Sequence, residues 1–279
     1  MSMQNFIPTV WAAGINRELE RNCVFVEDCN RKYEGQVKRR GDTVKILGVG
    51  RPTIKTIGRD KANESISAPE ELEDNSQIMT INQLSYYNYR VGDIDKAQAN
   101  EEYDAAIKGE TSEALSNEVD KYIASLVMSS GVAKLNSSAS QVTASNVLSM
   151  IDDAQQALFE NDVSGNTQII IDASPKFCKL LRQSLYNKDT DNSDLLLKQN
   201  VVAMYGKIKI KMSNNVHKTS DGADNIMIRT QRAIAFAQPL THVEAYRPEN
   251  YFADAIKGYI LYDAKVERPK EIININVKY

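Results

Sequence analysis

The longest periodic stretch of the chain is DIDKAQANEEYDAAIKGETSEALSNEVDKYIASLVMSSG, residues 93–131. Its apolar side chains recur at intervals of three and four, which is typical of an amphipathic helix. They are Tyr103, Ala106, Ile107, Ala114, Leu115, Val119, Tyr122, Ile123, Leu126 and Val127. Asp93 or Asp95 suits the N-cap, Gly131 suits the position after the last turn, and Gly109 is a weak point. At 1.5 Å per residue such a helix would be about 50 Å long, so we expect a strut rather than a core element.

A long β-hairpin is predicted before this helix. Its first part alternates β-forming residues with lysines and is interrupted by turn residues. The β-forming residues are Val37, Val44, Ile46, Ile54 and Ile57. A second extended run, residues 78–90, places Met79, Ile81, Tyr87 and Tyr89 on one face by period-two spacing. A two-stranded ribbon of this length is marginally stable alone, so it needs another surface to lie on.

Charge is distributed unevenly between these two regions. Residues 31–61 contain ten basic and three acidic side chains, whereas residues 93–120 contain two basic and nine acidic ones. Each run could be a solvated face. The alternative is that the basic ribbon of one subunit lies across the acidic helix of a neighbour, because opposite charges on facing surfaces guide association. Both interpretations stay open at this point.

The rest of the chain predicts a compact α/β segment followed by β-structure. Residues 136–145 are rich in Ser and Ala and predict a linker. Helices are expected at 147–158, 177–185 and 195–205, with Ser174-Pro175 as the N-cap and first turn of the second. Strands are expected at 167–173, 207–212, 225–229, 233–236, 259–267 and 272–277. The alternation KIKIKM at 207–212 predicts a half-exposed strand whose lysines discourage pairing with wrong partners.

Composition excludes several classes of protein. The chain has 279 residues and a formal net charge of -3, so it is not basic enough to coat nucleic acid. No apolar run approaches the roughly 18 residues of a membrane span, and the first residues lack a secretory-signal pattern. The three cysteines, an odd number, indicate free thiols in a reducing compartment.

No catalytic, cofactor-binding or metal-binding residues are predicted. Cys23 and Cys29 lack the spacing of a zinc or redox pair, and His217 and His242 are far apart in the sequence. Neither a phosphate-binding loop nor a nucleophile elbow is present. Residues 189–193 begin like a calcium loop, but the required glycine and closing glutamate are missing. We therefore expect a protein that is not an enzyme and has no cofactor.

Short motifs near both ends of the chain carry a resemblance to a known family. The first set is Ile7-Pro8, Trp11-Ala12, Leu19, Gly35-Gln36-Val37 and Gly41-Asp42-Thr43-Val44. The second set is residues 233–236, Val243-Glu244-Ala245-Tyr246-Arg247-Pro248, Phe252-Ala253-Asp254, Lys257-Gly258-Tyr259 and Glu267-Arg268-Pro269. In this order, together with the long hairpin and helix, they resemble the major capsid proteins of tailed bacteriophages. That family has the Hong-Kong-97-type fold.

The resemblance implies an α+β fold with five parts. Residues 1–35 would be an N-terminal arm, and residues 36–92 an extended β-hairpin loop. Residues 93–139 would hold the spine helix of a peripheral domain. Residues 140–245 would be an α/β axial domain, and residues 246–279 would be strands that return to the peripheral domain.

The function implied is that of a major head protein. Copies would self-assemble through pentamers and hexamers into an icosahedral shell that matures from a procapsid and encloses double-stranded DNA without sequence-specific binding. Partners would be a separate scaffolding protein, a portal and, as a further candidate, a decoration protein, with no membrane. The location would be the virion capsid, after assembly in the host cytoplasm.

The charge pattern and the resemblance together give the expected contact residues. The basic ones in the extended loop are Lys38, Arg39, Arg40, Lys45, Lys55 and Arg59. The acidic ones on the spine helix are Glu101, Glu102, Asp104, Glu110 and Glu113. Phe6 and Trp11 are expected to dock the arm.

Three other classes of protein remain as alternatives. An encapsulin-type bacterial nanocompartment has the same fold, and a cargo-binding pocket on its inner wall would mark it. An enzyme built on residues 140–245 would need a nucleophile or phosphate motif that this segment lacks. A DNA-binding protein that uses Lys38-Arg39-Arg40 would need an aromatic or helical partner there, but glycine-punctuated strands surround this motif.

Overall fold

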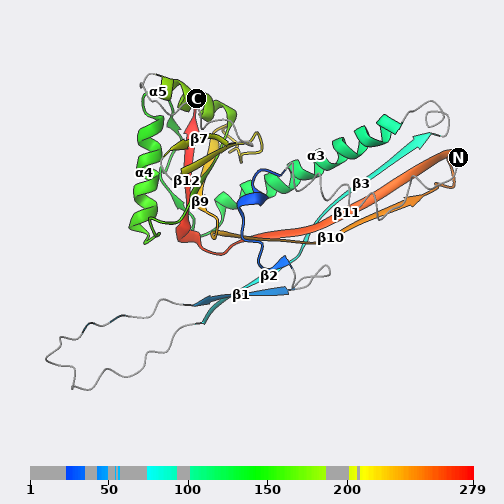
Figure 1. The fold of residues 1–279 in the computed structure, drawn as a ribbon, viewed down its shortest axis with the longest axis horizontal. Helices are drawn as coiled ribbons and strands as arrows, with labels where there is room; N and C mark the ends of the chain where they lie inside the picture. The colour runs from blue at the N-terminus through cyan, green and yellow to red at the C-terminus, as the bar shows by residue number, and fades with distance from the viewer. Residues whose placement is uncertain are drawn as a thin grey trace, which may run out of the picture.

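The structure of the protein is a computed structural model with a mixed α+β fold. It describes residues 23–34, 43–49, 54, 56, 74–92, 101–186, 201–205 and 208–279. Figure 1 shows a compact α/β part at one end of the molecule. From this part extend one long helix, α3 (Glu101–Ser125), and three long strands, β3 (Gln83–Gly92), β10 (Ile234–Tyr246) and β11 (Ala253–Val266).

The compact part is built on a seven-stranded sheet. Across the sheet the order is β4 (Ala133–Lys134), β12 (Ile272–Lys278), β9 (Asp224–Thr230), β6 (Ile169–Ala173), β8 (Ile208–Met212) and β7 (Val201–Tyr205), and β5 (Ser140–Gln141) also pairs with β12. All five residues of β6 are buried, as expected of a strand with neighbours on both edges. Helices α4 (Val147–Glu160) and α5 (Pro175–Tyr186) add Ile151, Leu158, Phe177 and Leu181 to the same core.

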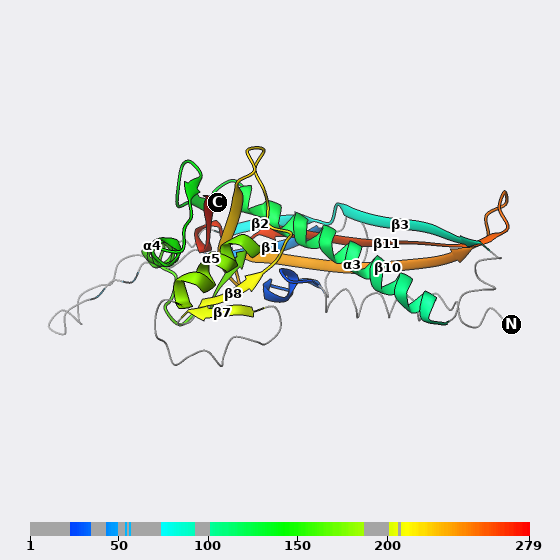
Figure 2. The same ribbon diagram turned by 90° about the horizontal axis from the view of Figure 1, so that it is seen from above.

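The projecting part is a three-stranded antiparallel sheet with α3 along one face. β11 is the middle strand, between β10 and β3, and Figure 2 shows α3 running over the three strands. The buried side chains of the helix belong to the same core cluster as those of β11; they are Leu115, Val119 and Ile123 with Ile256 and Ile260. The rings of Tyr122 and Tyr262 add an edge-to-face contact with centroids 5.7 Å apart. The apolar stripe predicted from the sequence therefore fixes α3 to this sheet.

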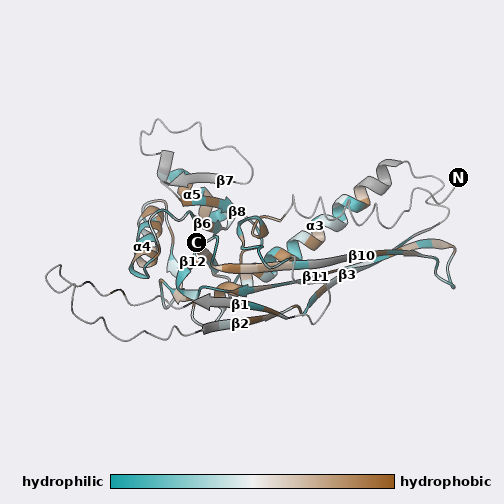
Figure 3. Ribbon diagram, turned by 60° about the horizontal axis from the view of Figure 1, so that its bottom comes forward, coloured by the Kyte–Doolittle hydropathy of each residue, from teal (hydrophilic) through white to brown (hydrophobic). Residues whose placement is uncertain are grey.

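A separate two-stranded hairpin covers the other face of the three-stranded sheet. Its strands are β1 (Thr43–Val49) and β2 (Asp74–Thr80), which pair antiparallel. Val44, Ile46, Met79 and Ile81 are buried against Ala235, Ala237 and Leu261. Leu261 and Tyr262 are consecutive in β11 and point to opposite faces, so the hairpin and α3 lie on opposite sides of the sheet. In Figure 3 the end of β10 that both layers cover is coloured as hydrophobic.

The predicted long helix is confirmed over its described length. It has 25 residues and continues into the 3-10 turn η5 (Leu126–Met128). The helix itself is about 37 Å long at 1.5 Å per residue, and it continues through Gly109 without interruption. Gly131 follows with a φ of 89°, the conformation expected after a helix. Asp93 and Asp95, the predicted N-caps, lie outside the described residues.

Two predictions for residues 195–212 were wrong. Val201–Tyr205 is strand β7 rather than the end of a helix, because it pairs antiparallel with β8. Residues 195–200 lie outside the described residues. β8 is not a half-exposed strand, since β6 and β7 occupy its two edges and Ile208, Ile210 and Lys211 are buried. The alternation of Lys and Ile suggested one wet face, but acidic groups of a distant segment cover that face.

Three further differences concern segment boundaries. The predicted linker 136–145 contains β5, and Val142 is buried because this stretch lies beside β12. The extended run 78–90 is divided at Ile81 and Asn82 between β2 and β3, which belong to different sheets. Strand β12, preceded by the turn η7 (Pro269–Glu271), lies in the seven-stranded sheet, whereas the resemblance predicts that it returns to the peripheral domain with the spine helix.

The start of α5 follows the sequence prediction. The backbone N–H of Phe177 donates a hydrogen bond to Oγ of Ser174 at 3.4 Å, and Pro175 is the first helical residue. A serine before a proline therefore caps this helix, as its propensities predict.

Candidate functional site

The most extensive polar cluster in the described residues surrounds residues 23–34, which we call the anchor segment. The segment contains one 3-10 turn, η2 (Val26–Asp28). Its Cys23, Phe25, Val26 and Cys29 are buried in the main core. The segment is therefore part of the fold, and its polar contacts show which elements hold it.

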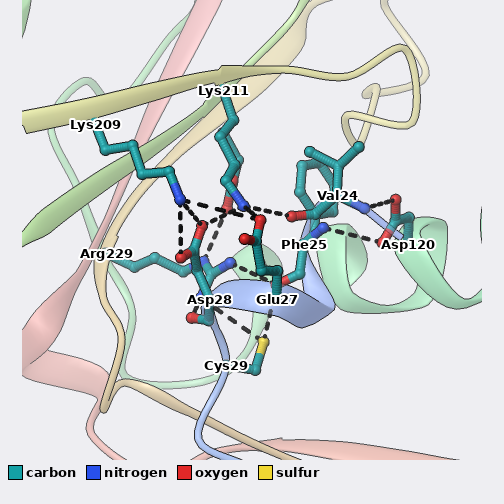
Figure 4. Close-up of polar contacts among 10 residues, drawn as sticks. Val24, Phe25, Glu27, Asp28, Cys29, Asp120, Lys209, Lys211 and Arg229 are labelled. Atoms are coloured by element: carbon teal, nitrogen blue, oxygen red, sulfur yellow. Dashed lines mark hydrogen bonds and ion pairs between the residues drawn. The ribbon is translucent and has the colours of Figure 1, made fainter. Parts of the chain in front are cut away.

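Asp120 of α3 holds the beginning of the anchor segment. Its two carboxylate oxygens accept hydrogen bonds from the backbone N–H groups of Val24 at 2.9 Å and Phe25 at 3.1 Å (Figure 4). Burial raises the pKa of this carboxyl to about 7, although the two N–H groups oppose the shift. One member of the acidic run on α3 thus points into the subunit rather than toward solvent.

Two lysines of β8 hold the acidic turn of the segment. Nζ of Lys211 donates to the carbonyl of Val24 at 3.0 Å and to Oε2 of Glu27 at 2.5 Å, and it also pairs with Asp28. Nζ of Lys209 lies 3.3 Å from Oδ1 of Asp28. Burial opposes the charge of Lys211, but hydrogen bonds to Asp28 and Glu27 outweigh it and raise the pKa of this lysine. The alternating lysines of β8 therefore form a docking surface inside the subunit (Figure 4).

Arg229 of β9 is buried beneath the anchor segment and binds both this segment and strand β6. Its Nε donates to Oδ2 of Asp172 on β6 at 2.8 Å. Its Nη2 donates to the carbonyl of Phe25 at 2.9 Å, and Nη1 donates to the carbonyl of Asp28. Burial opposes the charge of Arg229, but the combined effects of Asp172, Cys29 and Asp28 outweigh burial and raise the pKa of the guanidinium. Arg229 thus connects the segment's backbone to the centre of the seven-stranded sheet.

The second half of the segment contacts the three-stranded sheet and the hairpin. Asn30 bridges to Ala235 of β10, and its side-chain amide donates to Oε2 of Glu267 at 2.9 Å. Tyr33 packs against the apolar cluster of the hairpin. The anchor segment therefore touches α3, both larger sheets and the hairpin, and its position sets how these parts sit together.

The side chains of this cluster are suited to stabilising the fold. Burial raises the pKa of the Cys23 thiol to about 12 and that of Cys29 to about 11, so both thiols are protonated and poorly nucleophilic at neutral pH. In the part of the chain that the structure describes, no three His, Cys, Asp or Glu side chains are grouped to hold a metal ion.

The structure describes the side chains of only some of the predicted contact residues. Lys45 is exposed on β1, and Glu110 and Glu113 are exposed on α3, on the other side of the three-stranded sheet (Figure 1). Glu101, Glu102 and Asp104 lie in the first turns of α3, but their side chains are not among those described. The remaining predicted residues lie outside the described residues; they are Lys38, Arg39, Arg40, Lys55, Arg59, Phe6 and Trp11.

Sequence reasoning missed the anchor cluster. Its members come from separate elements, and Lys209 and Asp28 are 181 positions apart. Two features of the sequence could have indicated it. The acidic pair Glu27-Asp28 follows a short apolar run, and the strand at 207–212 carries alternating lysines that could pair with these two carboxylates. We interpreted those lysines as protection of a sheet edge.

Comparison with known proteins connects this fold to capsids. No protein-family model and no curated protein matches the sequence. A solved chain from Mycobacterium phage Che8 has a TM-score of 0.72 and 27% identity, and covers 91% of this chain and 90% of its own. The capsid of cyanophage P-SCSP1u has a TM-score of 0.68 at 13% identity, and covers 92% and 89%. The chain has the fold of a phage major capsid protein.

The capsid-protein fold confirms the resemblance predicted from the sequence. It also occurs in the virus-like particle of Pyrococcus furiosus, with a TM-score of 0.61 at 11% identity and coverage of 96% of this chain and 98% of that one. The phage neighbours are structural shell proteins, which supports a structural capsid role for this chain. Of the helices in the described residues, none is both long and apolar enough to cross a membrane.

Proposed function

We propose that this chain is a major capsid subunit of a tailed bacteriophage that assembles through pentamers and hexamers into an icosahedral shell. The observation that carries the proposal is the similarity to the Che8 chain over 91% of the residues at 27% identity. In a Hong-Kong-97-type arrangement, residues 1–35 would be the arm and 36–92 the extended loop. Residues 93–139 would hold the spine helix, 140–245 would form the axial domain, and 246–279 would be the returning strands.

Exposed apolar side chains on projecting elements support assembly. Ile54 is 88% exposed and Ile78, on β2, is 58% exposed. Phe252 is 89% exposed at the turn between β10 and β11, at the end of the molecule far from the compact part (Figure 1). The three side chains belong to separate segments of the chain. In the shell, neighbouring subunits would cover them.

The basic loop of one subunit is proposed to contact the acidic spine helix of its neighbour. On the helix side, Glu110 and Glu118 border an open groove of about 590 Å³ between α3 and β3, with Tyr86 and Leu115 in its lining. The groove offers acidic edges and an apolar floor, which complements a ribbon with lysines, arginines and exposed isoleucines. The loop residues would be those from Lys38 to Arg59 named above.

Double-stranded DNA would be enclosed without sequence-specific contacts. A formal net charge of -3 suits a container, because tight DNA binding requires many Lys and Arg contacts to phosphates. A scaffolding protein, a portal and a decoration protein are the proposed partners. Assembly would take place in the host cytoplasm, and the product would be the virion capsid.

The proposal is tested by size-exclusion chromatography and negative-stain electron microscopy of the purified chain, with and without its scaffolding partner. We expect closed shells, or discrete pentamers and hexamers that close into shells when the partner is added. A chain that stays monomeric with the partner present would contradict the proposal.

A bacterial nanocompartment shell is a second candidate. It is favoured by the near-complete match to the virus-like particle of Pyrococcus furiosus, which covers 96% of this chain. The contents of purified shells distinguish the two. Nuclease-protected DNA indicates a phage head, whereas a cargo protein bound to the inner wall indicates a compartment.

A further inference from the structure

The charged groups around the anchor segment do not balance. Four carboxyl groups and three cations meet there, namely Glu27, Asp28, Asp120 and Asp172 with Lys209, Lys211 and Arg229. The lysines pair with Glu27 and Asp28, and Arg229 pairs with Asp172. Within the described ranges of the chain, no ion pair joins Asp120 to a lysine, arginine or histidine. Asp120 is therefore the odd carboxyl group of the cluster.

Burial favours the neutral form of Asp120, whereas its two backbone hydrogen bonds favour the ionised form. The residue is 1% exposed, and its hydrogen-bond partners are the N–H groups of Val24 and Phe25. An ionised carboxyl group that is buried without a cation is strongly disfavoured, so such a group binds a proton more tightly. Burial raises the pKa of Asp120 to about 7, although the N–H groups of Val24 and Phe25 oppose the shift; the nearby charge of Asp172 adds to it, and Lys211 opposes it.

Every element packed around Asp120 contributes charged or titratable groups. They are Cys23, Glu27, Asp28, Cys29 and Arg31 of the anchor segment, Asp172 of β6, Lys209 and Lys211 of β8, Arg229 of β9, Tyr262 of β11, and Glu118 and Lys121 of α3. Glu118 and Lys121 are exposed and pair with each other, as Arg31 does with Glu34. With Asp120 neutral, the cluster contains three carboxylates, of which that of Glu27 is 58% exposed, and three cations.

We propose that Asp120 and the anchor segment form a proton-linked clasp, in which docking of the segment onto α3 is accompanied by uptake of one proton from water by Asp120. With the segment displaced, Asp120 faces water and is ionised near neutral pH, as an ordinary aspartate is. With the segment docked, the neutral acid is favoured, and its carbonyl oxygen still accepts a hydrogen bond from the backbone. The proton thus replaces the missing cation.

The direction of the pH effect follows from linkage. The docked state binds a proton more tightly than the displaced state, so docking is strengthened where that proton is bound. The strengthening is complete below the ordinary pKa of an aspartic acid and is lost as the pH rises through about 7. Acidification therefore tightens the clasp, and mild alkali loosens it.

Release of the clasp would affect more than one contact. The same segment carries the carbonyl of Phe25, which binds Arg229, and Asn30, which bridges to β10. The hairpin contact of Tyr33 lies at its end. Loss of the Asp120 proton would thereby change how the hairpin is held against the three-stranded sheet. This inference concerns the single subunit and does not rest on the proposed capsid function.

The test is amide hydrogen exchange of residues 23–34 in the full chain across pH 6 to 8, measured by mass spectrometry and corrected for intrinsic exchange rates. We expect protection about tenfold higher at pH 6 than at pH 8, from a docked pKa of about 7. Asp120→Asn, which is neutral throughout, should remove this dependence. The matched control is Glu118→Gln, an exposed carboxylate of the same helix, which should keep it.

The inference is overturned if wild-type protection is flat or rises with pH, or if Asp120→Asn keeps the wild-type dependence. If Asp120→Asn fails to fold, infrared difference spectra of the wild-type chain between pH 6 and pH 8 test whether Asp120 releases a proton over this interval. Loss of a protonated-carboxyl band over this interval is expected. A spectrum without that loss would show that Asp120 does not release a proton between pH 6 and pH 8, and would end the proposal.

Discussion

The compact part and the projecting part of the subunit bury their residues to different extents. In the compact part, β6 is buried on both faces and the internal charge of Arg229 is paired with Asp172. In the projecting part, the hairpin buries Ile46 on one face but leaves Ile78 exposed on the other. The compact part is thus completed by contacts within one chain, whereas the projecting part presents surfaces that a second chain can cover.

The largest effect is expected in the compact part, at its internal charge. Arg229→Met leaves Asp172 buried without its partner and removes the bonds to the anchor segment. We expect the free energy of unfolding, measured by urea denaturation, to fall by about 3–5 kcal/mol. The control is Arg232→Met, since Arg232 is half exposed and lies 3.5 Å from Glu271. It should cost about 0–1 kcal/mol, and equal losses in both variants would contradict the account.

The next comparison lies within the projecting part, between a buried and an exposed isoleucine. Ile46→Ala should lower the free energy of unfolding by about 2–4 kcal/mol, because Ile46 is packed between the hairpin and β10–β11. Ile54→Ala should change it by less than about 0.5 kcal/mol, because Ile54 is exposed.

A charged residue at position 54 should impair assembly without lowering stability. Ile54→Asp is expected to leave urea denaturation unchanged and to reduce the yield of shells in electron micrographs, because a neighbouring subunit would cover this side chain. Shells formed at wild-type yield by Ile54→Asp would show that this part of the loop contacts no other chain.

A smaller effect is expected where strands β3, β10 and β11 meet. A Cβ atom on Gly258 would overlap the hydroxyl of Tyr87 and lie 2.8 Å from the carbonyl oxygen of His242. Gly258→Ala should therefore destabilise by about 1–3 kcal/mol through overpacking, measured as a shift of the urea midpoint. Gly109→Ala is the opposite case, because nothing lies within 4 Å of its added Cβ in helix α3. It should stabilise by about 0.5–1 kcal/mol, and the two variants should differ in sign.

The smallest effect on stability is expected from reversing charge on the basic loop. Arg39→Glu, Arg40→Glu and Lys45→Glu in one chain should leave the free energy of unfolding within about 0.5 kcal/mol of wild type. Assembly followed by light scattering should be slower, and more so at low salt, because screening weakens exposed charge pairs. Reversal at Lys134, Lys218 and Lys270, exposed lysines of the compact part, is the control. Assembly at the wild-type rate by the loop variant would refute the electrostatic contact.

Local patterns predicted most of the fold. The three-and-four spacing predicted α3, the serine-proline pair predicted the start of α5, and the run at 167–173 predicted β6. These signals depend on neighbours within one or two turns, so they can be identified in one sequence. Residues 201–205 were assigned to a helix because their pairing with β8 involves backbone groups, which the side-chain pattern does not show.

The anchor cluster could not be predicted because it depends on contacts between distant segments. Lys211 lies in a strand whose alternation suggests a wet face, yet it is 1% exposed because Glu27 and Asp28 lie above it. Asp120 belongs to an acidic run that suggests a solvated helix face, yet it is 1% exposed and accepts hydrogen bonds from the backbone of residues 24 and 25. Charge in a sequence indicates exposure by default, and tertiary pairing reverses that expectation.

Electron cryo-microscopy of particles assembled with the scaffolding partner is the most direct test of the difference between the two parts. The account predicts closed shells in which Ile54, Ile78 and Phe252 are covered by neighbouring subunits, while the compact part keeps the arrangement seen in the single chain. Shells in which these three side chains remain in solvent, or no shells at all with the partner present, would contradict it.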